Sequence, residues 1–335
     1  MSKYKITLTP TGRFFFGGDQ KFQVGNTKDK FNDSYIIESR KFPQQTSLLG
    51  MLRFLILSND SAAFNKGTQT ISNAQKAEEL IGKESFQVGK ENKFGKIDNI
   101  GPCGLVKGNG KILFPEWMFE KYKDESKKET ELKPVDKDCT DYDAKLGIAV
   151  TFDNVKEDDI FIQDKRMGIN RDITTGKTDD GALYKQIFYR LADGYAFAFE
   201  AEVDYDMEKY KGQLVTLGGD NSQFVIGIEE PNPNEEPKVI NFIVTLQSDS
   251  FIKRDVAESA SFAVSDVVPF KCLQIGSVSY NRKNAKPSDY SKKLYLYKAG
   301  SIFFFDDKTA LKKFTVELES HKDFRQIGYN YYTVK

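Results

Sequence analysis

A short proline-rich segment divides the chain into two parts. Residues 231–237 read PNPNEEP, and they stand between the strand-like runs FVIGI and VINFIVTL. Proline fixes its own φ and lacks a main-chain donor, so a segment of this composition ends regular structure. The chain has 335 residues, which is about the length of two typical domains. We therefore expect an N-terminal domain over 1–230, a linker at 231–237 and a C-terminal domain over 238–335.

The order of the predicted elements is the same on both sides of the linker. Before it, the pattern predicts a strand at 3–9, a helix at 46–58, a hairpin of strands 183–191 and 195–203, a helical stretch at 206–212 and a strand at 223–228. After it, the pattern predicts a strand at 239–247, a helix near 265–270, strands at 273–280 and 293–297, a helix at 307–318 and a strand at 327–334. The order β-α-β-β-α-β is that of a ferredoxin-like unit and of RNA-recognition modules. We therefore expect an α+β fold with two ferredoxin-like domains.

Two local patterns support this assignment. Alternation in 195–203 places Tyr195, Phe197 and Phe199 on one face, which predicts a half-buried strand. Asp306 and Asp307 precede the apolar positions of the helix at 307–318 and are its candidate caps. Residues 59–160 show no such order, and Lys121–Asp143 carries 14 charged residues out of 23. We expect this region to be an insertion with a mobile, solvated part.

The composition limits the classes of partner and compartment. Forty-nine basic residues balance 49 acidic ones, so no whole-molecule field attracts a polyanion and any such site must be local. No apolar run is long enough to span a bilayer, and residues 1–10 show no signal-peptide core. Cys103, Cys139 and Cys272 form no CxxC pair, which favours a reducing environment. We expect a cytoplasmic protein that has no membrane contact.

The reactive side chains argue against most catalytic classes. The single histidine, His321, lies in the polar stretch ESHKDF, and no GxSxG, HExxH or phosphate-binding glycine motif is present. Histidine triads and multi-histidine metal sites are therefore excluded, and we expect no cofactor or metal. An isolated histidine in a charged run is most often a solvated surface residue, which is our expectation for His321.

The start of the helix at 46–58 is a candidate anion site. Arg40 and Lys41 precede Thr46 and Ser47, so two cations and a capping hydroxyl would meet the free N–H groups of a helix start. Arg53 is the only charge in an otherwise apolar helix, and Gly50 lowers helix propensity, which suggests that something approaches closely there. The alternative is a capped core helix in which Gly50 serves packing.

Residues 164–186 form a second candidate site. Three glycines and five cations, among them Arg166, Arg171 and Lys177, predict an extended basic loop with two arms. Such a protrusion can lie across a phosphate backbone. The alternative is an ordinary solvated loop.

Glycines next to aromatic residues form a third group. Glycine permits positive φ and close approach of another backbone, and aromatic rings beside it can stack on bases. The alternative is that most of these rings belong to the core. The glycines singled out are Gly17, Gly18, Gly218, Gly219 and Gly300, the last followed by Ser301.

Several of these motifs occur together in one protein family. They are RFFFGG (13–18), PQQTSLLGMLR (43–53), RMGINRDITTG (166–176) followed by DDGALY, LGGD (217–220), YKAGSIFFF (297–305) and QIGYN (326–330). In this order they resemble the Cmr3-like subunits, members of the RAMP superfamily in type III-B CRISPR RNA-guided effector complexes. The resemblance covers residues 13 to 329, with little that aligns over 59–160.

The resemblance implies a non-catalytic RNA-binding subunit in antiviral defence. Such a subunit caps the 5′ handle of the CRISPR RNA and contacts the large polymerase-like subunit and a backbone RAMP subunit. The stretch Arg166–Gly181 resembles the family's thumb hairpin, which inserts between guide and target RNA. Gly218, Gly219, Gly300 and Ser301 resemble residues of its glycine-rich loops. Two positions depart from the family pattern: Ala299 often has a proline in its place, and Asn330 a glycine.

Two other functions stay open from the sequence. One is a CRISPR RNA processing endoribonuclease of the same superfamily, with His321 as general acid or base. The other is a structural protein of an unrelated assembly, with glycines as turn residues. The chain also has 27 phenylalanines, so we expect an exposed aromatic patch that contacts a partner.

Overall fold

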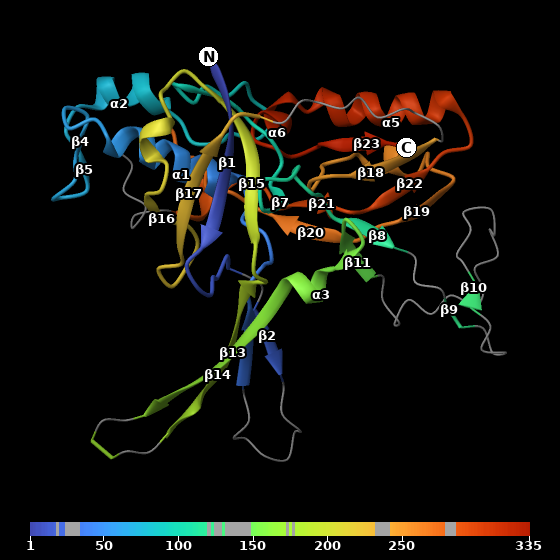
Figure 1. Cartoon of the computed structure of the whole chain (residues 1–335), viewed down its shortest axis with the longest axis horizontal. Helices are drawn as coiled ribbons and strands as arrows, with labels where there is room; N and C mark the ends of the chain where they lie inside the picture. Colours follow the sequence, from blue (N-terminus) through green and yellow to red (C-terminus); the bar gives the residue numbers. More distant parts are fainter. Residues whose placement is uncertain are drawn as a thin grey trace.

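The computed structural model describes residues 1–17, 20–23, 34–118, 122–123, 129–130, 149–171, 174–175, 178–231, 242–278 and 286–335. The protein is a mixed α and β structure with several sheets and few helices (Figure 1). A sheet formed before the linker and a sheet formed after it lie side by side, and a third sheet projects from the body. No helix among the described residues is long and apolar enough to cross a membrane.

The largest sheet belongs to the part before the linker. In spatial order its strands are β16 (Leu214–Thr216), β17 (Gln223–Glu229), β1 (Ser2–Pro10), β15 (Tyr195–Val203) and then β6 (Ile97–Ile100) and β7 (Gly104–Lys107), which pair with successive parts of β15. All of these neighbours are antiparallel. The predicted strands at 3–9, 195–203 and 223–228 are confirmed. The strands β6 and β7 come from the region that we expected to be an insertion.

The strand β15 is more buried than its alternation predicted. Ala196 and Ala198 on the second face are buried, as are Phe197 and Phe199 on the first. The two alanines form a small cluster with Val106 of β7, with Ile112 packed against it. The alternation therefore predicted the two faces of β15 correctly, but it did not predict that other residues cover the face that carries the alanines.

The helix α1 (Gln45–Ser58) confirms the apolar helix at 46–58. Eight of its residues are buried, and the seven hydrophobic ones share one core with β1, β15 and β17. The helix α2 (Ala74–Ile81) packs beside it, and the two-stranded hairpin of β4 (Phe64–Asn65) and β5 (Thr70–Ile71) lies between them in sequence.

The projecting sheet carries the basic segment. Its order is β13 (Phe161–Arg171), β14 (Thr178–Leu191), β3 (Ser34–Glu38) and β2 (Gln20–Gln23). The strand β14 is antiparallel to β13 and parallel to β3, so the expected two-armed segment 164–186 is a β-hairpin with longer arms (Figure 1). The predicted hairpin of 183–191 with 195–203 is wrong. Residues 192–194 instead carry the chain from β14 in this sheet to β15 in the main sheet.

The sheet after the linker is smaller. Its order is β19 (Phe262–Val264), β22 (Ile302–Phe304), β18 (Ile243–Leu246) and β23 (Tyr332–Val334), and all neighbours are antiparallel. The helix α5 (Lys308–Ser320) packs Leu311, Phe314 and Leu318 into its core, which confirms the predicted helix at 307–318. The helices α4 (Arg254–Ala257) and α6 (Lys322–Gln326) are short.

Two predictions after the linker are wrong, and a third is confirmed only in part. The expected helix at 265–270 is the strand β20 (Val267–Phe270), which pairs with β21 (Leu294–Tyr297). No strand covers the described part of 273–280. The sheet instead contains β22, within GSIFFF, which was not predicted. The expected strand at 327–334 is limited to β23 because α6 and a turn take up the residues before it. A short apolar run fits a strand or a helix equally well, which explains the error at 265–270.

The remaining elements are small. A three-stranded sheet has the order β12 (Val155–Lys156), β11 (Ala149–Phe152) and β8 (Glu116–Met118), and α3 (Glu157–Ile160) leads from it into β13. The strands β9 (Tyr122–Lys123) and β10 (Glu129–Thr130) pair with each other. A 3-10 turn at Glu208–Tyr210 lies within the predicted helical stretch 206–212, and another is formed by Pro287–Asp289.

The largest hydrophobic core includes residues from both sides of the linker. Phe270, Phe324 and Ile327 belong to the same core as Phe86 and Leu48. A second core is confined to the C-terminal part, around Val244, Phe303 and Phe314. Residues 232–237 of the linker lie outside the described residues, and the division at 231–237 stays a prediction.

Candidate nucleic-acid interface

A groove of about 500 Å³ lies where the start of α1 meets the C-terminal part of the chain. One wall consists of residues 38–45, and the other includes 266–269, Lys298, Ala299 and Tyr329. Gln45 joins the walls, because its side-chain Nε2 donates to the carbonyl oxygens of Gly328 at 2.9 Å and Gly101 at 3.3 Å. The structure thus brings the first helix and the late YKAGS and QIGYN motifs together in one place.

The start of α1 differs from the expected anion site. The N-cap residue is Gln44, whose side chain makes no capping hydrogen bond, and Thr46 and Ser47 lie inside the helix. The buried hydroxyl of Tyr329 lies near the main chain of Gln45, and burial raises the pKa of this tyrosine. The prediction of a capping hydroxyl from Thr46 or Ser47 is therefore wrong. Tyr329, from the far end of the sequence, occupies part of that place.

Lys41 is paired with carboxylates. Its Nζ lies 2.7 Å from Glu157 Oε2 and 3.2 Å from Asp158 Oδ1, both in α3. The same ammonium group lies over the rings of Phe161 and Tyr189, 5.8 Å and 5.7 Å from their centroids. Lys41 therefore ties the chain before α1 to the base of the projecting hairpin, and its charge is compensated within the protein.

Arg40 and Lys298 are the other cations of the groove. Arg40 Nη2 lies 3.5 Å from the carbonyl oxygen of Pro269, and its main-chain N–H donates to Gly17 at 2.9 Å. Between them lies Asp249, which accepts a hydrogen bond from the N–H of Ala299 at 3.0 Å. Burial raises the pKa of Asp249, although Ala299, Arg40 and Lys298 act in the opposite direction. Asp249 is thus poised to accept hydrogen bonds beside two cations.

The groove as a whole is not basic. Its lining carries the three cations Arg40, Lys41 and Lys298 and the four carboxylates Glu38, Glu157, Asp249 and Asp266. It also contains the aromatic residues Phe42, Trp117, Tyr189 and Tyr329. Such a lining is better suited to neutral groups that form hydrogen bonds and stack on aromatic rings than to a run of phosphates.

Arg53 and Gly50 do not contribute to the groove. Arg53 donates to the carbonyl oxygen of Gly82 at 3.1 Å, at the end of α2, and desolvation lowers its pKa to about 10. Its role is to brace α1 against the carbonyl end of α2, where a cation is favourable. A Cβ atom at Gly50 would meet nothing within 4 Å. The expected close approach at Gly50 is therefore not made by the described part of the chain.

Most of the singled-out glycines pack against the chain itself. A Cβ atom at Gly218 would lie 2.4 Å from the carbonyl oxygen of Phe15, and Gly219 donates its N–H to this oxygen at 2.7 Å. Gly300 has φ +90 and faces Trp117, whose ring would be 2.2 Å from a Cβ atom. Ser301 is fully buried and donates to the carbonyl oxygen of Lys298 at 2.7 Å. These residues pack against the chain itself and are not among those that line the groove.

Gly17 is different, because it has φ +72 and nothing within 4 Å of its Cβ position. Its carbonyl oxygen accepts the main-chain N–H of Arg40, a residue of the groove. Gly18 lies outside the described residues.

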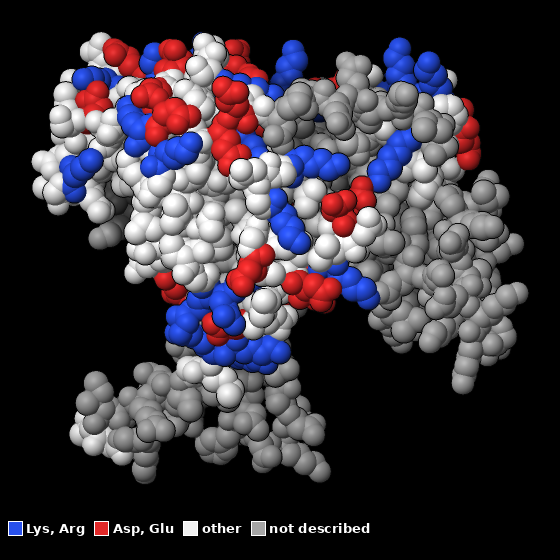
Figure 2. Space-filling model, in the orientation of Figure 1, with Lys and Arg blue, Asp and Glu red and all other residues white. Residues whose placement is uncertain are grey.

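Of the three cations predicted on the hairpin, one has an exposed side chain that the structure describes. Arg166 is exposed on β13, opposite Gln186 of β14. The backbone of Arg171 pairs with Thr178 close to the tip, and Lys177 lies outside the described residues. Figure 2 shows Lys and Arg side chains gathered where the projecting sheet leaves the body. This place, and not the groove, is the basic surface near the site.

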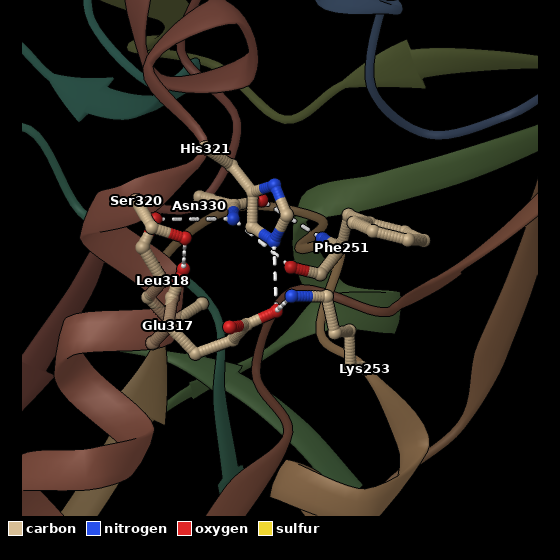
Figure 3. Close-up of polar contacts among 7 residues, drawn as sticks. All are labelled: Phe251, Lys253, Glu317, Leu318, Ser320, His321 and Asn330. Atoms are coloured by element: carbon tan, nitrogen blue, oxygen red, sulfur yellow. Dashed lines mark hydrogen bonds and ion pairs between the residues drawn. The ribbon is translucent and has the colours of Figure 1, made fainter. Parts of the chain in front are cut away.

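His321 occupies a polar cluster between α5 and α6 (Figure 3). Its Nε2 lies 3.0 Å from Glu317 Oε1, and Lys253 approaches the same carboxylate at 3.5 Å. The imidazole also packs edge-on against Phe251, with 5.0 Å between centroids. Its side chain is only 17% exposed, so the expectation of a solvated surface residue is wrong. It is not among the residues that line the groove.

Asn330 explains one departure from the family pattern. Its φ is +59, in the left-handed region where glycine and asparagine are the usual residues. Its buried side chain accepts from the N–H of Phe251 at 2.8 Å and donates to the carbonyl oxygens of Phe251 and Leu318 at 3.0 and 3.2 Å (Figure 3). Asparagine therefore replaces glycine without loss of this backbone conformation, and it fixes the end of the groove wall.

Other expected features of the surface have mixed outcomes. The exposed aromatic residues of the described part are Phe54 on α1, Tyr295 on β21, and Phe242 and Tyr290 outside the helices and strands. A contiguous aromatic patch therefore stays a prediction. Cys103 and Cys272 are free thiols, and Cys139 lies outside the described residues. No group of three metal-ligating side chains occurs among the described residues.

Sequence reasoning missed four residues of the groove and the basic surface. They are Arg13, Asp249, Lys298 and Tyr329. Arg13, Lys298 and Tyr329 lie inside motifs that drew attention because of their glycines, and not because of these three side chains. Asp249 gave no signal, since it becomes part of the groove only through the fold.

Comparison with solved structures found chains of similar fold. Two cryo-EM structures of the type III-B Cmr-beta complex contain similar chains. One complex is bound to cognate target RNA, and its chain has a TM-score of 0.55 and 15% identity, with 98% of this chain and 96% of that chain covered. The other is bound to cognate target RNA and AMPPnP, with a TM-score of 0.51, 15% identity and coverages of 97% and 94%. At this identity the likeness shows a common fold.

No curated protein sequence matches the chain. The model of the CRISPR-associated protein family Cas_Cmr3 matches residues 148–334, which is more than half of the chain. This match includes the projecting hairpin, the LGGD loop and the complete C-terminal sheet. The chain therefore belongs to the Cmr3 family of CRISPR-associated proteins.

Proposed function

We propose that the protein is a subunit of a type III-B CRISPR effector complex that holds the 5′ handle of the CRISPR RNA. The observation that carries the proposal is the groove, which combines the start of α1 with Lys298, Ala299 and Tyr329 beside a projecting hairpin. Family membership supports the assignment to a CRISPR complex. In that complex the protein links the large polymerase-like subunit to the backbone RAMP subunits, in antiviral defence.

The sheet orders support two ferredoxin-like units. In the order β17, β1, β15, β6/β7 and in the order β23, β18, β22, β19, the first strand of the unit lies between its fourth and third strands. This is the arrangement that β-α-β-β-α-β connectivity produces in an antiparallel ferredoxin-like sheet. In the first unit the second strand is then 97–107, not 183–191. The basic hairpin becomes an insertion between the second and third strands.

The groove suits bases and ribose hydroxyls. Asp249 can accept hydrogen bonds, Arg40 and Lys298 can donate them, and Tyr329 and Phe42 provide aromatic surface. A handle has a fixed sequence, so a site that reads base edges is more useful there than one that only binds phosphates. The phosphates would be met outside the groove, on the basic hairpin, which lies toward the guide and its target.

We propose that the protein itself does not cleave RNA. His321 is engaged by Glu317 and Phe251 and does not line the groove, which supports a structural role. Incubation of the purified protein with precursor CRISPR RNA and with target RNA, with and without divalent metal, tests this. Cleavage by the wild type that is lost in His321→Ala would favour the processing endoribonuclease instead.

Co-expression of the protein with the other subunits of its complex tests the handle assignment. Sequencing of the RNA that co-purifies is expected to give one uniform 5′ end. The variant R40Q/K298Q should carry less RNA or RNA with ragged 5′ ends, because both groove cations with free donors are lost. The variant R254Q, which changes an exposed arginine paired with Glu258, is the matched control. RNA with random ends in the wild type, or no RNA, contradicts the proposal.

A further inference from the structure

At the base of the projecting hairpin, cations outnumber the carboxylates that pair with them among the described residues. In the groove Lys41 is paired with Glu157 and Asp158, and four carboxylates outnumber three cations. At the base of the projecting hairpin, by contrast, Arg166 has no carboxylate within ion-pair distance among the described residues, and Lys165 beside it is exposed. An RNA strand that enters the groove needs partners for its phosphates, and this place can provide them.

Two arginines share one aromatic ring at this place. The Cζ atom of Arg13 lies 4.8 Å from the centroid of Phe188, and that of Arg166 lies 5.8 Å from it. Phe188 is 3% exposed and is packed on Phe15, whose ring centroid is 5.3 Å away. The ring is therefore a fixed platform for both guanidinium groups.

The backbone around the platform is fixed as well. Asp164 is the cross-strand partner of Phe188, and Gln186 is that of Arg166, so these side chains share one face of the hairpin. Gln186 Nε2 donates to Asp220 Oδ2 at 2.8 Å and ties this face to the LGGD loop. Asp164 lies 4.0 Å from Arg13, at the limit of an ion pair. One carboxylate at this distance leaves the pair of arginines with excess positive charge.

We propose that Arg13 and Arg166, held on Phe188, bind consecutive backbone phosphates of single-stranded RNA where the hairpin leaves the body. The proposal rests on the proposed function and names the group that this surface takes. Stacking on a ring fixes the plane of a guanidinium group while its N–H edge stays available, and this edge matches two phosphate oxygens. The two arginines share one carboxylate, at 4.0 Å from Arg13, and a phosphodiester strand would compensate the excess positive charge.

Binding of short RNA by the full chain, measured as a function of salt, tests the proposal. The probes are oligouridylate and oligoadenylate of equal length. For a single strand each phosphate contact contributes about 0.7 to the slope of log K against log salt. The variant R13Q/R166Q should therefore flatten the slope by about 1.4 and weaken binding roughly tenfold near physiological salt. The loss should be equal for both probes, because phosphates are common to them.

Two further variants distinguish a specific phosphate site from a diffuse positive field and from the effect of losing the guanidinium geometry. Arg190→Gln removes an exposed arginine on the same face of β14 that makes no ring contact with Phe188 in the described structure, and it should leave the slope nearly unchanged. R13K/R166K keeps both charges and removes the planar forks. It should keep the slope and lose part of the affinity.

The outcomes are distinct. An unchanged slope in R13Q/R166Q overturns the inference, and so does an equal effect of Arg190→Gln, because the surface then acts only as a diffuse field. A loss confined to one homopolymer also overturns it, since the arginines would then read bases. If the wild type retains a uniform 5′ end in co-purified RNA while the slope is unchanged, the inference fails and the proposed function stands. If the wild type binds no RNA alone or in its complex, both fail.

Discussion

At the scale of single residues, the C-terminal wall of the groove depends on main-chain hydrogen bonds. Asn330 supplies three of them from a fully buried side chain, and Asp249 accepts one from Ala299. A proline at position 299 would have no N–H for Asp249. Ala299 and Asn330 therefore take part in hydrogen bonds that a proline or a glycine at these positions would not make.

Two substitutions at Asn330 distinguish the contribution of its side-chain hydrogen bonds to stability from that of its left-handed backbone conformation. Asn330→Gly keeps easy access to positive φ but leaves buried groups of Phe251 and Leu318 unpaired, at a cost of about 1–3 kcal/mol for a buried polar group without a partner. Asn330→Ala loses the same bonds and adds about 1–2 kcal/mol of left-handed strain. Urea unfolding should therefore rank the wild type above Asn330→Gly and Asn330→Ala lowest. Equal stability of the two variants would show that the backbone strain is relieved by rearrangement.

At the scale of elements, the hairpin is anchored by α3 and by the chain before α1. Lys41 lies between the carboxylates of Glu157 and Asp158 and over the rings of Phe161 and Tyr189. It joins the segment before the first helix to the start of β13. Lys41 is therefore more important for the position of the hairpin than for contact with an anion.

Lys41→Gln tests this role. The change should lower the free energy of unfolding by about 1 kcal/mol, the upper end for a partly exposed ion pair. It should leave the salt slope of RNA binding unchanged, because Lys41 releases no counterion when RNA binds. Chemical unfolding and the RNA titration described above provide both readouts. A flatter salt slope with unchanged stability would restore Lys41 to the RNA-binding residues predicted from the sequence.

The elements also show what the sequence could predict. Helices α1 and α5 and strands β1, β15 and β17 have long, regular patterns, and these were found. Strands β6 and β7 are short and separated by Gly101 and Pro102, so no pattern distinguished them from the surrounding loops. The adjacency of 183–191 and 195–203 in sequence suggested a hairpin, but β14 pairs with β13 and β15 pairs with β1. Local pattern cannot decide between such pairings, since they depend on contacts distant in sequence.

The candidate site was likewise predictable from local patterns, but not where it depends on contacts distant in sequence. The basic hairpin and the start of α1 were visible as local concentrations of charge. The pairing of Lys41, the burial of Arg53 and the position of Arg13 against Phe188 were not, because each joins residues far apart in the chain. Glycine motifs indicated close approach correctly, but the approaching group at Gly218 and Gly300 is the protein itself.

At the scale of the whole molecule, the core connects the two parts that the linker separates. Phe324 is 1% exposed, and its ring centroid lies 5.6 Å from that of Phe86 and 5.7 Å from that of Phe270. Phe86 precedes the linker, and the other two follow it. The groove lies beside this junction, since Tyr329 contacts both Phe324 and Phe270. The geometry of the groove therefore depends on how firmly the two parts are held together.

A pair of phenylalanine variants tests the connection. Phe324→Ala removes a ring from the shared core, and Phe314→Ala removes an equally buried ring of the C-terminal core, whose ring contacts among the described residues are with Phe303 and Phe305. Each should cost about 3–5 kcal/mol. In hydrogen exchange measured by mass spectrometry, Phe324→Ala should reduce protection on both sides of the linker, including residues near Phe86. Phe314→Ala should reduce it mainly in α5 and β22. Loss of protection confined to residues after 238 in Phe324→Ala would mean that the two parts are independent domains, and the groove would then be able to open without unfolding either of them.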